Sequence, residues 1–127
     1  MARPLRILVA DDDPEMLDVL VAELEAAGAE VARAEDGAAL IQRLANEGPF
    51  DLVITDLAMP WMSGLQVAHA ARTAQLATPL IVITARREPE IEQQVAALGE
   101  RALLLRKPFD REQLHAAVAA LVGRRSA

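Results

Sequence analysis

Short apolar runs alternate with amphipathic segments along the whole chain. The apolar runs are rich in leucine and β-branched residues, as strands are, and they cover 5–10, 30–34, 52–55, 80–84 and 102–105. The segments between them repeat apolar residues at helical spacing, and they cover 16 to the stop at Gly28, 37–46, 64–74, 88–98 and 110–122. Strands that alternate with helices indicate βαβ units and a parallel sheet.

The polarity of each run predicts its place in the sheet. Runs 5–10, 52–55 and 80–84 are almost continuously apolar, which is expected of central strands covered on both faces. Run 30–34 alternates polar and apolar residues, which suits an edge strand. With right-handed crossovers, a five-stranded parallel sheet in the order 2-1-3-4-5 satisfies this pattern. No linker or repeat interrupts it, so we expect one α/β domain over residues 1–127.

Polar side chains fall at the strand ends of the predicted sheet. Asp11 and Asp12 follow the first strand, and Asp56 ends the third. Thr84 ends the fourth strand, and Lys107 follows the fifth. The carboxyl ends of parallel strands meet at one edge, and ligands bind there where the strand order reverses. In the order above the reversal falls between the first and third strands, which would bring the three aspartates together.

Three converging carboxylates raise one another's pKa, so this arrangement implies a bound cation. Oxygen ligands with room for water and phosphate favour Mg²⁺ over Ca²⁺. Lys107 would add a positive charge and Thr84 a hydroxyl donor, and together they could hold the oxygens of a phosphoryl group. Asp56 lies between the cation-binding pair and these two side chains, so we expect phosphoryl transfer onto Asp56.

Four stretches of the sequence resemble the successive motifs of the receiver domain of bacterial two-component response regulators, in particular the single-domain, chemotaxis-regulator-like kind. They are ILVADDDP (7–14), DLVITDLAMPWMSGLQV (51–67), PLIVITA (79–85) and LLLRKPF (103–109). The resemblance runs from about 5 to 122. It implies a flavodoxin-like (βα)5 three-layer fold that accepts a phosphoryl group from the phosphohistidine of a sensor kinase.

The resemblance also assigns roles to the acidic residues. Asp56 matches the phosphoacceptor. Asp12 matches the acid that usually binds Mg²⁺ directly, and Asp11 matches its neighbour, which often acts through water. The backbone carbonyl of Ala58, two residues beyond the acceptor, would be a further metal ligand.

Further positions of the family pattern bear on switching and on partners. Thr84 matches the switch hydroxyl, and Lys107 matches the phosphate-contacting lysine, whose bond to Pro108 is typically cis. Leu104 stands where receivers usually carry an aromatic side chain. The stretch 99–107 is one residue longer than the usual pattern, which leaves the register of the fifth strand open. Trp61 either packs on a neighbour in its loop or contacts a partner.

Composition excludes several functions. The formal net charge is −6 and the basic residues are scattered, which argues against nucleic-acid binding. The chain has no cysteine and two histidines, so a zinc site is not expected, and His69 and His115 are expected to be plain surface residues. No apolar stretch has the length of a membrane span or the pattern of a signal peptide, so we expect a cytoplasmic protein without membrane contact.

Each polar residue also has a simpler interpretation. An Asp pair after a strand commonly caps a helix, Asp56 alone could be a turn residue, and Thr84 could cap the following helix. These interpretations do not explain why all of these residues fall on one sheet edge. Asp13 is different: it precedes Pro14, so we expect it to be the N-cap of the first helix, with proline at the first helical position.

The expected output is binding, because only 123–127 follow the last predicted helix and no effector domain is expected. Phosphorylation by a sensor histidine kinase or a histidine phosphotransfer protein would switch the surface of the fourth helix, fifth strand and fifth helix toward a downstream protein target. Three alternatives remain: the phosphorylated form could be a homodimer, the chain could be a phosphate relay or sink, or it could be the receiver fragment of a larger regulator or hybrid kinase. A phosphatase that uses Asp56 as its nucleophile is disfavoured. Such enzymes have a second acid two residues further on, which protonates the leaving group, and here that position is Ala58. We expect no enzyme activity beyond the chain's own phosphorylation and dephosphorylation.

Overall fold

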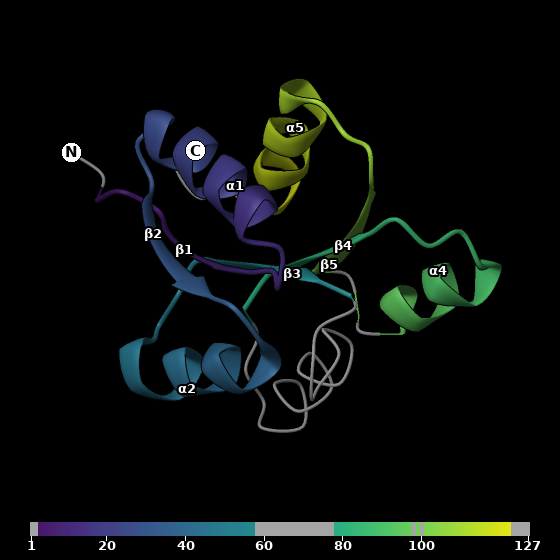
Figure 1. Ribbon diagram of the computed structural model, residues 1–127, viewed down its shortest axis with the longest axis horizontal. Coiled ribbons are helices and arrows are strands. Elements are labelled where there is room, and N and C mark those ends of the chain that lie inside the picture. Colours follow the sequence, from purple (N-terminus) through teal and green to yellow (C-terminus); the bar gives the residue numbers. More distant parts are fainter. Residues whose placement is uncertain (1–2, 58–77, 98, 100, 123–127) are drawn as a thin grey trace.

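The computed structural model describes residues 3–57, 78–97, 99 and 101–122. Five parallel strands form one sheet in the order β2-β1-β3-β4-β5 (Figure 1), as the sequence predicts. The strands are β1 (Arg6–Ala10), β2 (Glu30–Ala34), β3 (Leu52–Asp56), β4 (Leu80–Thr84) and β5 (Ala102–Arg106). The helices in the described part are α1 (Pro14–Ala26), α2 (Gly37–Glu47), α4 (Pro89–Ala96) and α5 (Arg111–Val122). The helix expected over 64–74 lies outside the described residues.

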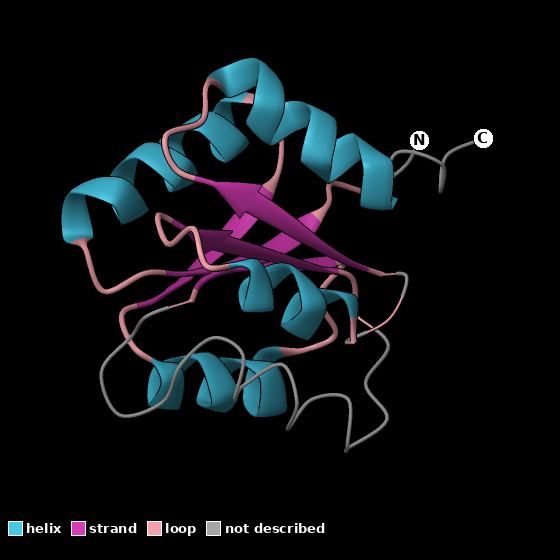
Figure 2. Cartoon of the chain, turned by 90° about the vertical axis from the view of Figure 1, so that its right-hand side faces the viewer, coloured by secondary structure: helices cyan, strands magenta, loops and turns pink. Residues whose placement is uncertain are grey.

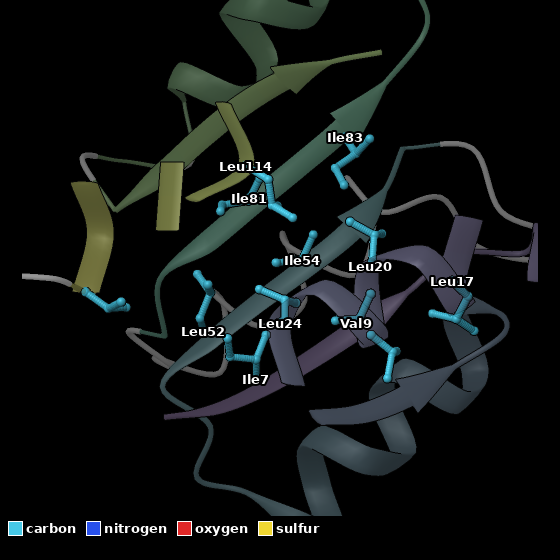
Figure 3. Packing of buried hydrophobic residues seen from close by; sticks show 12 residues of the cluster. Ile7, Val9, Leu17, Leu20, Leu24, Leu52, Ile54, Ile81, Ile83 and Leu114 are labelled. Atoms are coloured by element: carbon cyan, nitrogen blue, oxygen red, sulfur yellow. The ribbon is translucent and has the colours of Figure 1, made fainter. Parts of the chain in front are cut away.

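The sheet lies between two helical layers, with α1 and α5 on one face and α2 and α4 on the other (Figures 1 and 2). Successive strand residues point to opposite faces, so each central strand contributes to two apolar clusters. The cluster under α1 and α5 is drawn in Figure 3 and contains Ile7, Val9, Leu17, Leu20, Val21, Leu24, Leu52, Ile54, Ile81, Ile83, Leu114 and Val122. Burial on both faces fixes the carboxyl ends of β1, β3 and β4 in place. No helix in the described part is long and apolar enough to cross a membrane.

The two edge strands are less buried than the central ones. In β2 the side chains of Glu30 and Arg33 are exposed, and every residue of β5 is half-buried. The β4–β5 pairing places Thr84 opposite Arg106 and therefore Val82 opposite Leu104, which resolves the register that the sequence left open. Leu104 packs against the apolar cluster on the α2 and α4 face.

The ends of the helices follow from local sequence. The side chain of Asp13 accepts a hydrogen bond from the backbone N–H of Glu15 at 3.0 Å, and Pro14 is the first residue of α1, so the predicted N-cap is confirmed. Gly28 follows α1 with φ 98°, a left-handed conformation that glycine adopts without steric cost. The helix expected over 88–98 is shorter, because α4 ends at Ala96.

Glu23 of α1 joins that helix to α5. Its Oε1 accepts hydrogen bonds from His115 Nε2 at 2.7 Å and from Arg111 Nε at 2.8 Å. His115 keeps 37% of its side chain exposed, and its neighbour Leu114, anchored in the core, brings it against α1. The hydrogen bond from His115, followed by that from Arg111, holds the pKa of the Glu23 carboxyl below its usual value.

Asp13→Ala tests the cap of α1. The substitution removes the acceptor of the Glu15 N–H, and we expect the free energy of unfolding to fall by about 1 kcal/mol. Urea unfolding followed by circular dichroism measures this change. The control is Glu25→Ala, which removes an exposed carboxylate near the end of the same helix and should change stability by less than about 0.5 kcal/mol. An equal loss in both variants would contradict the capping role.

Glu23→Gln tests the contact between α1 and α5 through its pH dependence. Because the folded pKa of Glu23 lies below the ordinary value of 4.5, its contribution to stability is complete above that value. The contribution is lost as the pH falls through the folded pKa. We expect Glu23→Gln to be less stable than the wild type at neutral pH, with a difference that shrinks as the pH falls below 4.5 and through the folded pKa. Urea midpoints of both proteins across this range measure the difference, and a difference that stays constant with pH would refute the assignment.

Candidate functional site

Three aspartates converge at the carboxyl edge of the sheet. Asp11 and Asp12 directly follow β1, and Asp56 is the last residue of β3. The β1–β3 pairing aligns Ala10 with Thr55, so the residues that come next on the two strands lie at the same level. One carboxylate oxygen from each aspartate lies within 4.8 Å of the other two. The structure therefore brings together the three acids that the sequence predicts to meet.

Asp11 is the most constrained of these acids. It is 1% exposed, and its Oδ1 accepts a hydrogen bond from the backbone N–H of Asp13 at 2.9 Å. Its Oδ2 is buried and has no hydrogen-bond partner among the described residues. A buried carboxylate oxygen without such a partner is costly, so this atom indicates a place for a cation or a donor.

Lys107 supplies positive charge from the end of β5. Its Nζ lies 3.5 Å from Asp11 Oδ2 and 3.8 Å from Asp56 Oδ2, which are ion-pair distances longer than a hydrogen bond. The backbone N–H of Lys107 donates to the carbonyl of Thr84 at 2.7 Å, which ties the lysine to the end of β4. The Lys107–Pro108 peptide bond is cis, as the resemblance implied.

Thr84 lies at the same edge and is 1% exposed. Its Oγ1 accepts a hydrogen bond from the backbone N–H of Arg86 at 2.9 Å, which leaves its own proton available for donation. The helix that follows begins at Pro89 after Glu88, so Thr84 is not its cap.

Other predicted positions are placed only in part. Ala58 and Trp61 lie outside the described residues, so their predicted roles are not tested. Leu104 is half-buried and aliphatic, and it packs in the apolar cluster instead of bonding with polar residues of the site.

Sequence reasoning missed Arg106 and Glu92. The guanidinium of Arg106 donates to the carbonyl of Arg86 and, at 3.1 Å, to Glu92 Oε1 of α4. The signal that finds Arg106 is its position opposite Thr84, but that position is known only once the register of β5 is known.

The cluster fits a hard divalent cation. Its donors are carboxylate oxygens, which such cations prefer, and Asp12 is exposed where a hydrated ion could approach. One lysine beside three carboxylates leaves the site short of positive charge, and Asp11 Oδ2 has no hydrogen bond within the described residues besides its ion pair with that lysine. The arrangement can bind a metal ion and stabilise added negative charge beside Asp56.

Comparison with known proteins agrees with this geometry. The family model of the response regulator receiver domain matches residues 7–119. The response regulator MprA of Mycobacterium sp. (strain KMS) is 38% identical over 124 residues, which are 97% of this chain and 53% of that protein. The uncharacterized transcriptional regulatory protein YrkP of Bacillus subtilis (strain 168) is 38% identical over 119 residues, which are 94% of this chain and 50% of that protein. The chain thus spans about half the length of these curated relatives.

Solved structures match over nearly the whole chain. The receiver domain of the Francisella response regulator 1452 has a TM-score of 0.87 at 26% identity, covering 95% of this chain and 98% of that chain. The chemotaxis response regulator CheY4 of Vibrio cholerae has a TM-score of 0.81 at 31% identity, covering 93% of this chain and 98% of that chain. With the same motifs, fold and acidic cluster, the chain belongs to the response regulator receiver domains, the signalling domains of two-component systems.

Proposed function

We propose that Asp56 takes up a phosphoryl group from a sensor histidine kinase or a histidine phosphotransfer protein, with Mg²⁺ bound beside it. The observation that carries this proposal is the convergence of Asp11, Asp12 and Asp56, with Lys107 Nζ at 3.5 and 3.8 Å from two of their oxygens. This arrangement combines a nucleophile, a cation site and a fixed positive charge within one group of side chains.

Asp56 is the nucleophile of the proposed reaction. It ends a strand whose residues are buried, and it is itself 9% exposed, so its carboxylate is held in place but accessible. One carboxylate oxygen forms a bond to phosphorus while the bond between phosphorus and the donor histidine nitrogen breaks. The electron pair of the broken bond returns to the imidazole, and the product is an acyl phosphate on Asp56.

Asp11, Asp12 and Asp56 would hold the Mg²⁺ ion. Their oxygens are hard ligands, and Asp11 Oδ2, which has an ion pair with Lys107 but no hydrogen bond within the described residues, supports a cation at this position. The carbonyl of Ala58 is the further ligand that the family resemblance implies. When bound, Mg²⁺ supplies positive charge against the negative charge that develops on the phosphoryl oxygens.

Lys107 and Thr84 would contact the phosphoryl group from the other side. Lys107 Nζ already lies 3.8 Å from Asp56 Oδ2, so it is placed to pair with an oxygen of a phosphoryl group bonded to that carboxylate. Thr84 keeps a hydroxyl proton that can be donated to a phosphoryl oxygen, because within the described residues its Oγ1 accepts from the Arg86 N–H and donates to no other group.

The output of this receiver domain, about residues 5–122, would be a change in binding at the surface of α4, β5 and α5. In the sequence β5 lies between α4 and α5, and its Leu103 and Leu105 are half-buried. Leu104 and Pro108 are the positions that we expect to move with the site. The proposed partners are a downstream protein target and, in the phosphorylated form, a second copy of the chain, all in the cytoplasm. Trp61 is a proposed partner contact.

Asp12→Asn tests the electrostatic cost of the site. Without divalent ions, we expect the variant to be more stable than the wild type by about 1 kcal/mol, because one of three neighbouring carboxylates loses its charge. With excess Mg²⁺, the wild type should gain stability and the variant should gain much less. Thermal unfolding with chelator and with Mg²⁺ measures both effects. Glu25→Gln, an exposed carboxylate outside the cluster, is the control; a gain from Mg²⁺ as large in Asp12→Asn as in the wild type would argue against the metal site.

Incubation with Mg²⁺ and acetyl phosphate tests the phosphoacceptor. Intact mass should show one added phosphoryl group on the wild type, none on Asp56→Asn and a smaller fraction on Asp12→Asn. Asp13→Asn keeps the helix cap and should match the wild type. A phosphoryl group on another residue would refute the assignment, and repeated hydrolysis of a phosphomonoester would indicate a phosphatase instead.

A further inference from the structure

Arg106 lies beside Thr84 on the same face of the sheet. The two residues are opposite one another in the β4–β5 register, and the neighbouring pair Val82 and Leu104 packs in the cluster under α2 and α4. The Arg106 side chain is 24% exposed. The β5 side chains on this face are those of Ala102, Leu104 and Arg106. The first two are aliphatic, so the side-chain hydrogen-bond donors of β5 on this face belong to Arg106.

Arg86 is held at both of its backbone groups. Its N–H donates to Thr84 Oγ1 at 2.9 Å, and its carbonyl accepts from Nη1 of Arg106. The surrounding loop, 85–88, is exposed, so apolar burial does little to fix it. These two hydrogen bonds therefore help to hold the Arg86 N–H against Thr84.

The two contacts of Arg106 differ in what they hold. Glu92 is 67% exposed, and an ion pair with so exposed a carboxylate contributes little. The bond to the Arg86 carbonyl is charge-assisted and holds a backbone group of the loop, so it is the contact that restrains the loop. Glu92 then serves to orient the guanidinium, while the Arg86 carbonyl receives the main restraint.

The direction of the Thr84 hydroxyl depends on this restraint. A threonine side chain can occupy several χ1 rotamers, and a hydrogen bond at Oγ1 selects one of them. In this structure that bond comes from Arg86, and the hydroxyl proton stays available for donation.

We propose that Arg106 is a positioning residue for phosphoryl transfer, which fixes the Arg86 backbone and through it the Thr84 hydroxyl. The inference rests on the proposed function, because it assigns Arg106 a part in the reaction at Asp56. It gives this chain a hydrogen-bonded link between β5 and Thr84 at the sheet face where Leu104 offers only apolar contact.

Arg106→Met in the full chain tests this role, since methionine keeps an apolar stem but loses both donors. With acetyl phosphate and saturating Mg²⁺, we expect the rate of phosphorylation to fall roughly threefold to tenfold, as loss of one orienting hydrogen bond implies. The Kd for Mg²⁺, measured by calorimetry, should stay unchanged. Arg106→Lys should recover part of the rate, because an ammonium can still donate to the Arg86 carbonyl.

Arg43→Met is the matched control. Arg43 is 40% exposed and pairs with Glu47 on α2, so its loss also removes an arginine ion pair but leaves the loop at Arg86 intact. A rate for Arg106→Met equal to that of Arg43→Met would overturn the proposal.

Combination with Thr84→Ala tests whether Arg106 acts through Thr84. In that background Arg106→Met should cause no further fall in rate, because the hydroxyl that it positions is gone. A further fall of the same size would show a separate role for Arg106 and would also overturn the proposal. If the wild type itself takes no phosphoryl group on Asp56, the proposed function fails. If Arg106→Met is phosphorylated at the wild-type rate, only the role of Arg106 fails.

Discussion

The parallel pairing of β1 with β3 is the constraint on which the site depends. It aligns Ala10 with Thr55, so that Asp11 and Asp56 emerge at one level although they are far apart in sequence. The strands are buried on both faces, and a close-packed core does not let their ends move apart to relieve charge repulsion. The fold therefore concentrates negative charge at one point and holds it there, which favours binding of a cation.

Charge at this edge is partly offset by a lysine from the other half of the sheet. Lys107 reaches two of the carboxylates from the end of β5, and its backbone is bonded to the Thr84 carbonyl. One buried oxygen of Asp11 still lacks a hydrogen-bond partner within the described structure. Departure from full satisfaction of buried polar groups is typical of functional sites, where stability is exchanged for binding.

Polar contacts also join elements on both faces of the sheet. On the face of α4, Arg106 joins the Arg86 carbonyl to Glu92 by hydrogen bonds. On the opposite face, Glu23 of α1 accepts hydrogen bonds from Arg111 and His115 of α5 and so joins the two helices. Every residue of β5 is half-buried, so the first of these networks lies near solvent.

The sequence alone determined the strand order, the acidic edge and the Asp13 cap, because each follows from local polarity or from the rule that parallel strands end together. The pairing of His115 with Glu23 and the bond from Arg106 to the Arg86 carbonyl could not be predicted, because they join segments whose side-chain distances no local pattern encodes. The β5 register belonged to the same class. Only tertiary packing decided it, since the apolar residues of β5 satisfy more than one alignment until the neighbouring strand and helices are in place.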